Sequence, residues 1–233
     1  MHPGELIRYL SEIGMLAFAI TDESSVMAYP ELEMVWETGK YTAKPLYGME
    51  MLVSDNDDRY CISVLMKNEE GKSSLYRMIT ENTCEDPYPI FDLDTLLNNR
   101  EGMLIGSGTD KGRLYALALT DSSDVVIKDE LSKYDYVELS DELGIPVVAV
   151  CDARYTDKIV RKALLIMKNW NEETDELPDN HFWSTQKMLN AFAYLSEDKA
   201  KEIVIDNTHL IAEMKKLMVY CKNKEYNPSL GLR

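Results

Sequence analysis

Short runs of apolar residues alternate along the chain with stretches in which apolar residues recur every three or four positions. The first pattern is typical of buried β-strands and the second of amphipathic helices. Strands are predicted over residues 15–20, 43–54, 59–67, 102–107, 134–139 and 145–150. Helices are predicted over 4–14, 30–39, 69–82, 93–99, 113–119, 157–168, 184–195 and 197–218, with Gly14 and Gly39 as the expected ends of the first two.

This alternation predicts an α/β fold with a largely parallel sheet. Strands 43–54 and 59–67 are separated only by the turn Asp-Asn-Asp-Asp, so we expect these two to pair directly. About six or seven strand–helix units in one chain favour a barrel. Because no repeat or linker interrupts the pattern, we expect one domain over residues 1–218 and a loose tail over 219–233.

Polar side chains follow most of the predicted strands. In an α/β barrel such residues gather at one rim, where the chemistry of the fold takes place. Carboxylates there would suit Mg²⁺ or Mn²⁺, and a metal could activate water against a phosphoester. The alternative is that they cap helices or pair with Lys and Arg. The rim positions are Asp22, Glu23, Glu50, residues 107–110, Glu138 and residues 152–154.

The loop Gly-Ser-Gly-Thr-Asp-Lys-Gly over 106–112 joins a predicted strand to a predicted helix. Its backbone N–H groups could cradle a phosphate. The spacing of its glycines matches neither of the two common phosphate-binding motifs, so a plain strand–helix turn is the alternative interpretation.

The chain is strongly acidic: 41 Asp and Glu oppose 25 Lys and Arg among 233 residues, a formal charge of −16. A general nucleic-acid surface needs clustered cations, and anionic membranes repel an acidic protein, so neither partner is expected. The four cysteines form no paired motif and no secretory pattern precedes them. They indicate reduced thiols in the cytoplasm.

Several long segments of the sequence resemble segments of one protein family. The most specific are REGMLIGSGTDKGRLYALAL (100–119) and STQKMLNAFAYLSEDKAKEIVIDNTHLIAEM (184–214). They are similar to the PHP (polymerase and histidinol phosphatase) domain of PolC-type bacterial DNA polymerase III α subunits, over roughly residues 5 to 215. The resemblance implies a distorted (β/α)7 TIM-like barrel. It also implies relatives that bind metal ions, mostly through histidines, and hydrolyse phosphoesters.

The resemblance also assigns former metal-ligand positions. Glu50 matches the glutamate of a Tyr-Gly-x-Glu motif, and Asp152 matches the aspartate of an Asp-x-His motif. Glu23 stands where the family has the histidine of Thr-Asp-His. These three carboxylates are the metal ligands that the resemblance implies, should a site survive.

At other former ligand positions, this chain has a residue different from the metal-binding residue of the family. Thr83 and Thr109 align where the family has histidine or cysteine, and Arg154 replaces the histidine of Asp-x-His. A guanidinium cannot bind a metal, and its fixed charge repels one. We expect Arg154 to pair instead with Asp152 or Glu50, as a salt-bridge cluster in place of the old site.

Three hypotheses of function follow. The first is a degenerate, catalytically inactive PHP domain that acts as a structural or protein-interaction module with replication proteins and needs no cofactor. The second is a reduced metal-dependent phosphoesterase that uses Glu23, Glu50 and Asp152 with Mg²⁺ or Mn²⁺. The third is a fragment of a split polymerase gene. No polymerase activity is expected, because the short turn after 43–54 leaves out the exonuclease that PolC-type chains insert there, and no palm region follows.

Overall fold

The computed structural model describes residues 2–83, 89–120, 122–138, 147–151, 153 and 181–213, and at residue 83 the backbone alone. The predicted helix over 157–168 and the predicted tail over 219–233 lie outside these residues. The single-domain boundary at residue 218 therefore stays a prediction.

Most described elements fall where the apolar pattern predicts them. The strands are β1 (Ala17–Glu23), β2 (Lys44–Asp55), β3 (Asp58–Met66), β4 (Phe91–Asp92) and β5 (Met103–Gly106). The helices before residue 140 are α1 (Pro3–Glu12), α2 (Tyr29–Trp36), α3 (Glu69–Thr83), α4 (Leu93–Asn98), α5 (Arg113–Leu119) and α6 (Asp124–Leu131). The later ones are α8 (Thr185–Ala191), α9 (Glu197–Lys201), the π-helix η1 (Glu202–Asp206) and α10 (Asn207–Ala212).

The strands form a mixed sheet rather than a largely parallel one. Its order is β1-β2-β3-β5, with β4 paired to β2. The β1–β2 and β2–β4 pairs are parallel, whereas β2–β3 and β3–β5 are antiparallel. The reason is the predicted tight turn, in which Asn56 takes a positive φ of 55° and sends β3 straight back along β2.

Beyond β5 the sheet continues only as isolated parallel bridges. Gly106 pairs with Tyr136, and Val137 pairs with Val147. The strands predicted over 134–139 and 145–150 are thus reduced, in the described residues, to these contacts. The described part of the sheet is open, and the barrel expected from the sequence is not seen to close there.

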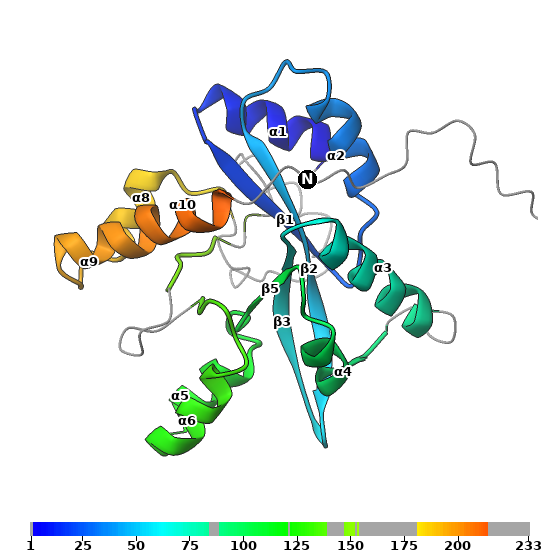
Figure 1. Ribbon diagram of the computed structural model, residues 1–233. Helices are drawn as coiled ribbons and strands as arrows, with labels where there is room; N and C mark the ends of the chain where they lie inside the picture. The colour runs from blue at the N-terminus through cyan, green and yellow to red at the C-terminus, as the bar shows by residue number, and fades with distance from the viewer. Residues whose placement is uncertain are drawn as a thin grey trace, which may run out of the picture.

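Alternation along each strand gives the sheet two different faces. One face carries fully buried apolar side chains such as Met49, Met51, Ile62 and Val64, which belong to the main core. Helices α1, α2, α3 and α4 contribute side chains to the same core and surround much of the sheet in Figure 1. Each fully buried large apolar side chain stabilises the fold by about 1.5–3 kcal/mol, so this face holds the domain together.

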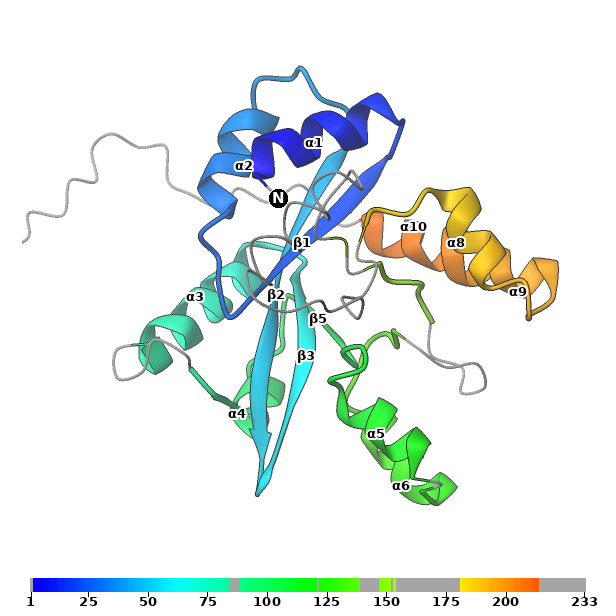
Figure 2. The same cartoon turned by 180° about the vertical axis from the view of Figure 1, so that it is seen from behind.

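The opposite face carries a small apolar cluster and a strip of polar residues. Leu65, Tyr136 and Val148 form the cluster, with Leu104 and Ile211 packed against it. Helices α8, α9 and α10 lie together on one side of the sheet, away from α3, in both views (Figures 1 and 2). The polar strip on this face includes Glu23, Glu50 and Ser63, which are partners across β1, β2 and β3.

The helix predicted as continuous over 197–218 is interrupted by η1. Ile203 in this π-helical turn accepts a hydrogen bond through its carbonyl from the Ala149 N–H (3.1 Å), and the Asn207 amide donates to the Val147 carbonyl (2.9 Å). The wider turn is thereby tied to the 147–151 segment. Among the described helices, none is both long and apolar enough to cross a bilayer.

Candidate functional site

Two of the predicted rim carboxylates lie side by side. Glu23 at the end of β1 is the direct register partner of Glu50 on the parallel strand β2, and Glu50 is in turn opposite Ser63 on β3. Cross-strand partners project to the same side of a sheet, so all three side chains share the polar face. The convergence of Glu23 and Glu50 agrees with the rim predicted from the sequence.

A lysine from the loop after β5 lies between these carboxylates. The Lys111 ammonium nitrogen is 3.4 Å from Oε1 of Glu50 and 3.7 Å from Oε2 of Glu23. Burial lowers the pKa of Lys111, but the carboxylates of Glu50 and Glu23 raise it by more, so the pKa lies above its ordinary value. Lys111 therefore carries a full positive charge at neutral pH.

The loop that carries Lys111 is fixed by backbone contacts to β3. The Cys61 N–H donates to the Lys111 carbonyl (3.0 Å). Gly108 has a positive φ of 71° and lies so close to the Cys61 carbonyl that a Cβ would come within 2.3 Å of its oxygen. Glycine is needed at position 108 for both reasons. It lets the loop pack closely against β3, and in this position Lys111 reaches the rim.

A buried hydrogen-bond chain continues the polar strip on the far side of Glu50. Tyr136 and Ser63 join their hydroxyl oxygens at 2.8 Å, and Ser63 donates to the carboxylate of Glu138. The backbone N–H of Glu138 donates to Oγ of Ser107 (3.1 Å). Burial raises the pKa of Glu138, and the negative charge of Glu50 raises it further, against a lowering by the Ser63 hydrogen bond.

Cys61 is the thiol closest to this strip. Burial raises the pKa of the Cys61 thiol to about 11, and the Glu50 carboxylate adds to the shift. A thiol with this pKa remains protonated at neutral pH, so it is a poor nucleophile.

Of the other predicted site residues, Thr109 is the one whose side chain the structure describes, and it does not join Glu23 and Glu50. Thr109 donates its hydroxyl to Asp110 (3.1 Å), within its own loop. Thr83 is the last residue of α3, and nothing is described of its side chain. Asp152 and Arg154 lie outside the described residues, so the predicted ion pair of Arg154 is not tested.

The sequence pattern also placed Asp22 at the rim, but its side chain lies on the other face of the sheet from Glu23 and Glu50. Strand β1 runs on through Glu23 instead of ending at Ile20. Side chains alternate along a strand, so Asp22 projects to the face opposite Glu23 and Glu50. It approaches Tyr29 on the core side, where its charge helps to raise the pKa of that phenol.

Sequence reasoning missed Lys111 and Ser63. Lys111 is the one cation in the 106–112 loop, and its place directly after a strand was a usable signal. Ser63 lies inside an apolar strand, and only the pairing of β2 with β3 reveals that it faces Glu50.

The described rim does not suit a divalent metal. No group of three or more His, Cys, Asp or Glu side chains gathers closely enough for one within the residues described. Where two carboxylates do meet, an ammonium already lies between them. A second cation there would be repelled by Lys111, and an ammonium has no lone pair to offer a metal.

Comparison with known proteins identifies the family. The profile of the PHP domain matches residues 1–139, which is more than half of the chain. The chain therefore belongs to the PHP domain family, as the sequence resemblance implied.

Among the individual relatives, the chain is similar to two polymerases. DNA polymerase III PolC-type of Halalkalibacterium halodurans is 32% identical in an alignment of 212 residues that takes in 73% of this chain and 14% of the polymerase. DNA polymerase III PolC-type of Staphylococcus aureus is 28% identical over 208 residues, 72% of this chain and 14% of the polymerase. The chain thus corresponds to 14% of the length of these curated relatives.

One solved structure was matched at lower similarity. It is the crystal structure of a protein from Bifidobacterium adolescentis described as a metal-dependent phosphoesterase. The match has a TM-score of 0.29 and 13% identity, and covers 94% of this chain and 71% of the other. At this level the likeness carries no argument about the chemistry of this chain.

Proposed function

We propose that this chain is a catalytically inactive PHP domain that acts as a structural or protein-interaction module. The observation that carries the proposal is the position of Lys111 between Glu23 and Glu50. The resemblance implies that relatives hold metal ions through residues at this end of the sheet, and here a side chain of the protein would supply the positive charge instead. The sheet is proposed to be part of a distorted barrel of the PHP type.

The electrostatics of the rim support this proposal. Two carboxylates and one ammonium carry a net charge of about −1, and the ammonium adds repulsion against any metal beside it. The protonated Cys61 thiol offers no metal ligand and no nucleophile at neutral pH. Arg154, at a former histidine position, would add a second fixed positive charge if it faces the same rim.

The proposed partners are replication proteins in the cytoplasm. This part of the proposal depends on the two polymerases to which the chain is similar. The formal charge of −16 argues for contact with proteins and against direct contact with DNA or with an anionic membrane.

Two assays on the same preparation of the full chain test this function. One measures binding to the purified replicative polymerase and sliding clamp of the same cell by biolayer interferometry. The other measures hydrolysis of bis(p-nitrophenyl) phosphate with Mn²⁺, beside a matched Glu50→Gln variant. We expect saturable binding to one replication protein and no hydrolysis above that of the variant.

Either of two results would contradict the proposal. Hydrolysis that requires Mn²⁺ and is lost in Glu50→Gln would restore the phosphoesterase hypothesis. Absence of binding to both replication proteins would remove the proposed partner.

A further inference from the structure

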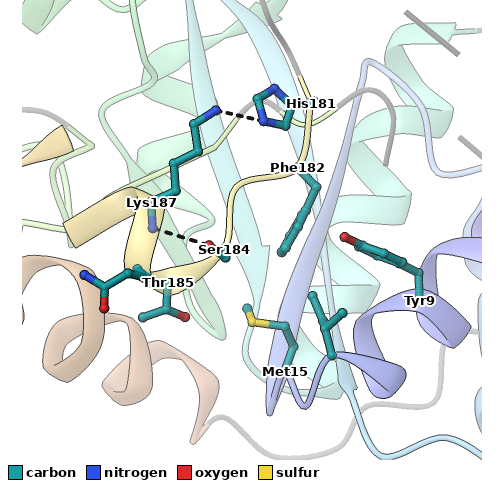
Figure 3. A pocket seen from close by; sticks show the side chains of 9 residues that line it. Tyr9, Met15, His181, Phe182, Ser184, Thr185 and Lys187 are labelled. Atoms are coloured by element: carbon teal, nitrogen blue, oxygen red, sulfur yellow. Dashed lines mark hydrogen bonds between the residues drawn. The ribbon is translucent and has the colours of Figure 1, made fainter. Parts of the chain in front are cut away.

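A hollow of the molecule, drawn in Figure 3, is lined by residues from α1, from the segment just before β1, and from the chain at the start of α8. Its volume is about 430 Å³, within the rough range of 300–1,000 Å³ found for small-molecule sites. Met15 lines it just before β1 begins, whereas Glu23 is the last residue of that strand. Seven residues of strand separate the two places by roughly 20 Å.

One side of this pocket is apolar and aromatic. Tyr9 of α1 and Phe182 meet edge to face, with ring centroids 5.8 Å apart and ring planes at 83°. Met15 and Ile13 complete this side, and Figure 3 shows Met15 and Phe182 on the same side of the hollow as Tyr9. Side chains of this kind bind the flat body of an aromatic ligand by contact and by exclusion of water.

The other side of the pocket carries a positive charge and several hydrogen-bonding groups. Lys187 directs its ammonium to Nε2 of His181 at 2.8 Å, and the same nitrogen lies 4.3 Å from the centre of the Trp183 ring. An ammonium only donates hydrogen bonds, so in this contact the imidazole nitrogen is the acceptor. Further groups come from Ser184, Thr185 and Gln186.

The charge of Lys187 is not neutralised by a carboxylate in the part of the chain that the structure describes. Its two described side-chain contacts are an imidazole and an indole, neither of which is an acid. The flexible four-carbon stem lets the ammonium turn toward an anion that enters the pocket. In a protein with a net charge of −16, a lysine beside an aromatic pocket that pairs with no carboxylate among the described residues is a specific feature.

We propose that this pocket binds a small aromatic acid. The aromatic body lies against Tyr9, Phe182 and Met15, and the acid group, a carboxylate or a phosphate ester, receives a charge-assisted hydrogen bond from Lys187. The hydroxyl groups of Ser184 and Thr185 are the neighbouring donors. The pocket is separate from the rim. The proposal of a ligand site here can therefore be tested independently of the proposed catalytic inactivity at the rim.

The test is isothermal titration of the full chain with 2-naphthoate, 2-naphthyl phosphate and the neutral 2-naphthylmethanol. The variants are Lys187→Met, which removes the charge, and Ile13→Asp, which adds a negative charge to the pocket wall. Ile13 is 45% exposed, so this change spares the core. The matched control is Lys128→Met, an exposed lysine on α6. Thermal unfolding of each variant verifies that it folds.

We expect at least one of the two anions to bind with a stoichiometry near one, and more tightly than the neutral compound. Lys187→Met and Ile13→Asp should each weaken binding about tenfold, the effect of one charge-assisted contact, while Lys128→Met leaves it unchanged. The stronger anion identifies the acid group. Equal binding of the neutral compound, equal loss in the control, or no binding of either anion would overturn the proposal.

Discussion

Lys111 adds little to the stability of the fold, and its larger proposed effect is to exclude a metal ion from the rim. Its side chain is 49% exposed, and those of Glu23 and Glu50 are 64% and 32% exposed. Ion pairs with this exposure contribute only about 0–1 kcal/mol each, because water and salt screen them. Even so, an ammonium held 3.4 Å from Glu50 occupies the space that a metal would need.

Glu138 gives the polar strip a predictable pH dependence. Its pKa in the folded protein is raised above the ordinary value of 4.5, chiefly by burial. The folded state therefore binds a proton that the unfolded state has already released. The stability contributed by the neutral carboxyl is fully present below about pH 4.5 and is lost as the pH rises through the raised pKa.

We therefore expect Glu138→Gln to gain stability relative to the wild type as the pH rises. Glutamine has no charge to desolvate, and its amide oxygen can still accept the Ser63 hydrogen bond. Urea unfolding at pH 5 and pH 8 measures the difference, and the exposed Glu101→Gln is the control. A difference between variant and wild type that stays constant with pH would contradict the assignment.

The strands and most helices were predictable because their signals are local. The runs 43–54 and 59–67 are mostly apolar, and the short turn of four residues between them favours antiparallel pairing. The adjacency of Glu23 and Glu50 followed from the same logic, since both come from parallel neighbouring strands. Helix α6 was missed because its eight residues carry a weak apolar pattern.

The sequence placed Lys111 in a loop after a strand, but its contacts with Glu23 and Glu50 could not be read from the sequence. They depend on how the 106–112 loop lies against the backbone of Cys61, a contact between segments far apart in the chain. The interruption of the last helix by η1 is of the same kind, because the Ala149 N–H that bonds to Ile203 comes from a distant segment. Local propensity does not contain such tertiary contacts.

Strand β5 offers a direct test of how the polar strip is packed. A Cβ on Gly106 would lie 2.3 Å from Oγ of Ser63 and 2.4 Å from the Tyr136 ring. The ring is held by its hydrogen bond to Ser63 and cannot move freely. We expect Gly106→Ala to lower the free energy of unfolding by about 1–3 kcal/mol, as overpacking of a core does.

The control is Gly4→Ala in α1, where a Cβ would meet its nearest neighbour at an ordinary 3.4 Å. That change should be neutral or stabilise by up to about 1 kcal/mol, because alanine favours the helix. Chemical denaturation measures both variants. A Gly106→Ala protein as stable as the wild type would mean that Tyr136 does not lie over β5 as described.

The molecule as a whole combines a PHP-family sheet with a rim at which an ammonium lies between two carboxylates. Its PHP sheet buries one apolar face under helices and leaves a polar face on which Glu23, Glu50 and Lys111 meet. The aromatic pocket with Lys187 lies at the opposite end of β1. The two places can therefore be changed separately by mutation, which keeps the tests of the two proposals independent.

The most direct test of the proposal that Lys111 takes the place of a metal ion is a Mn²⁺ titration followed by electron paramagnetic resonance. The full chain is purified without chelator or nickel and compared with Glu50→Gln and Lys111→Met. We predict that the wild type binds no more Mn²⁺ than Glu50→Gln does, and that Lys111→Met, with its two carboxylates released, binds more than either. One tightly bound Mn²⁺ per wild-type chain, lost in Glu50→Gln, would contradict the account and indicate a working metal site.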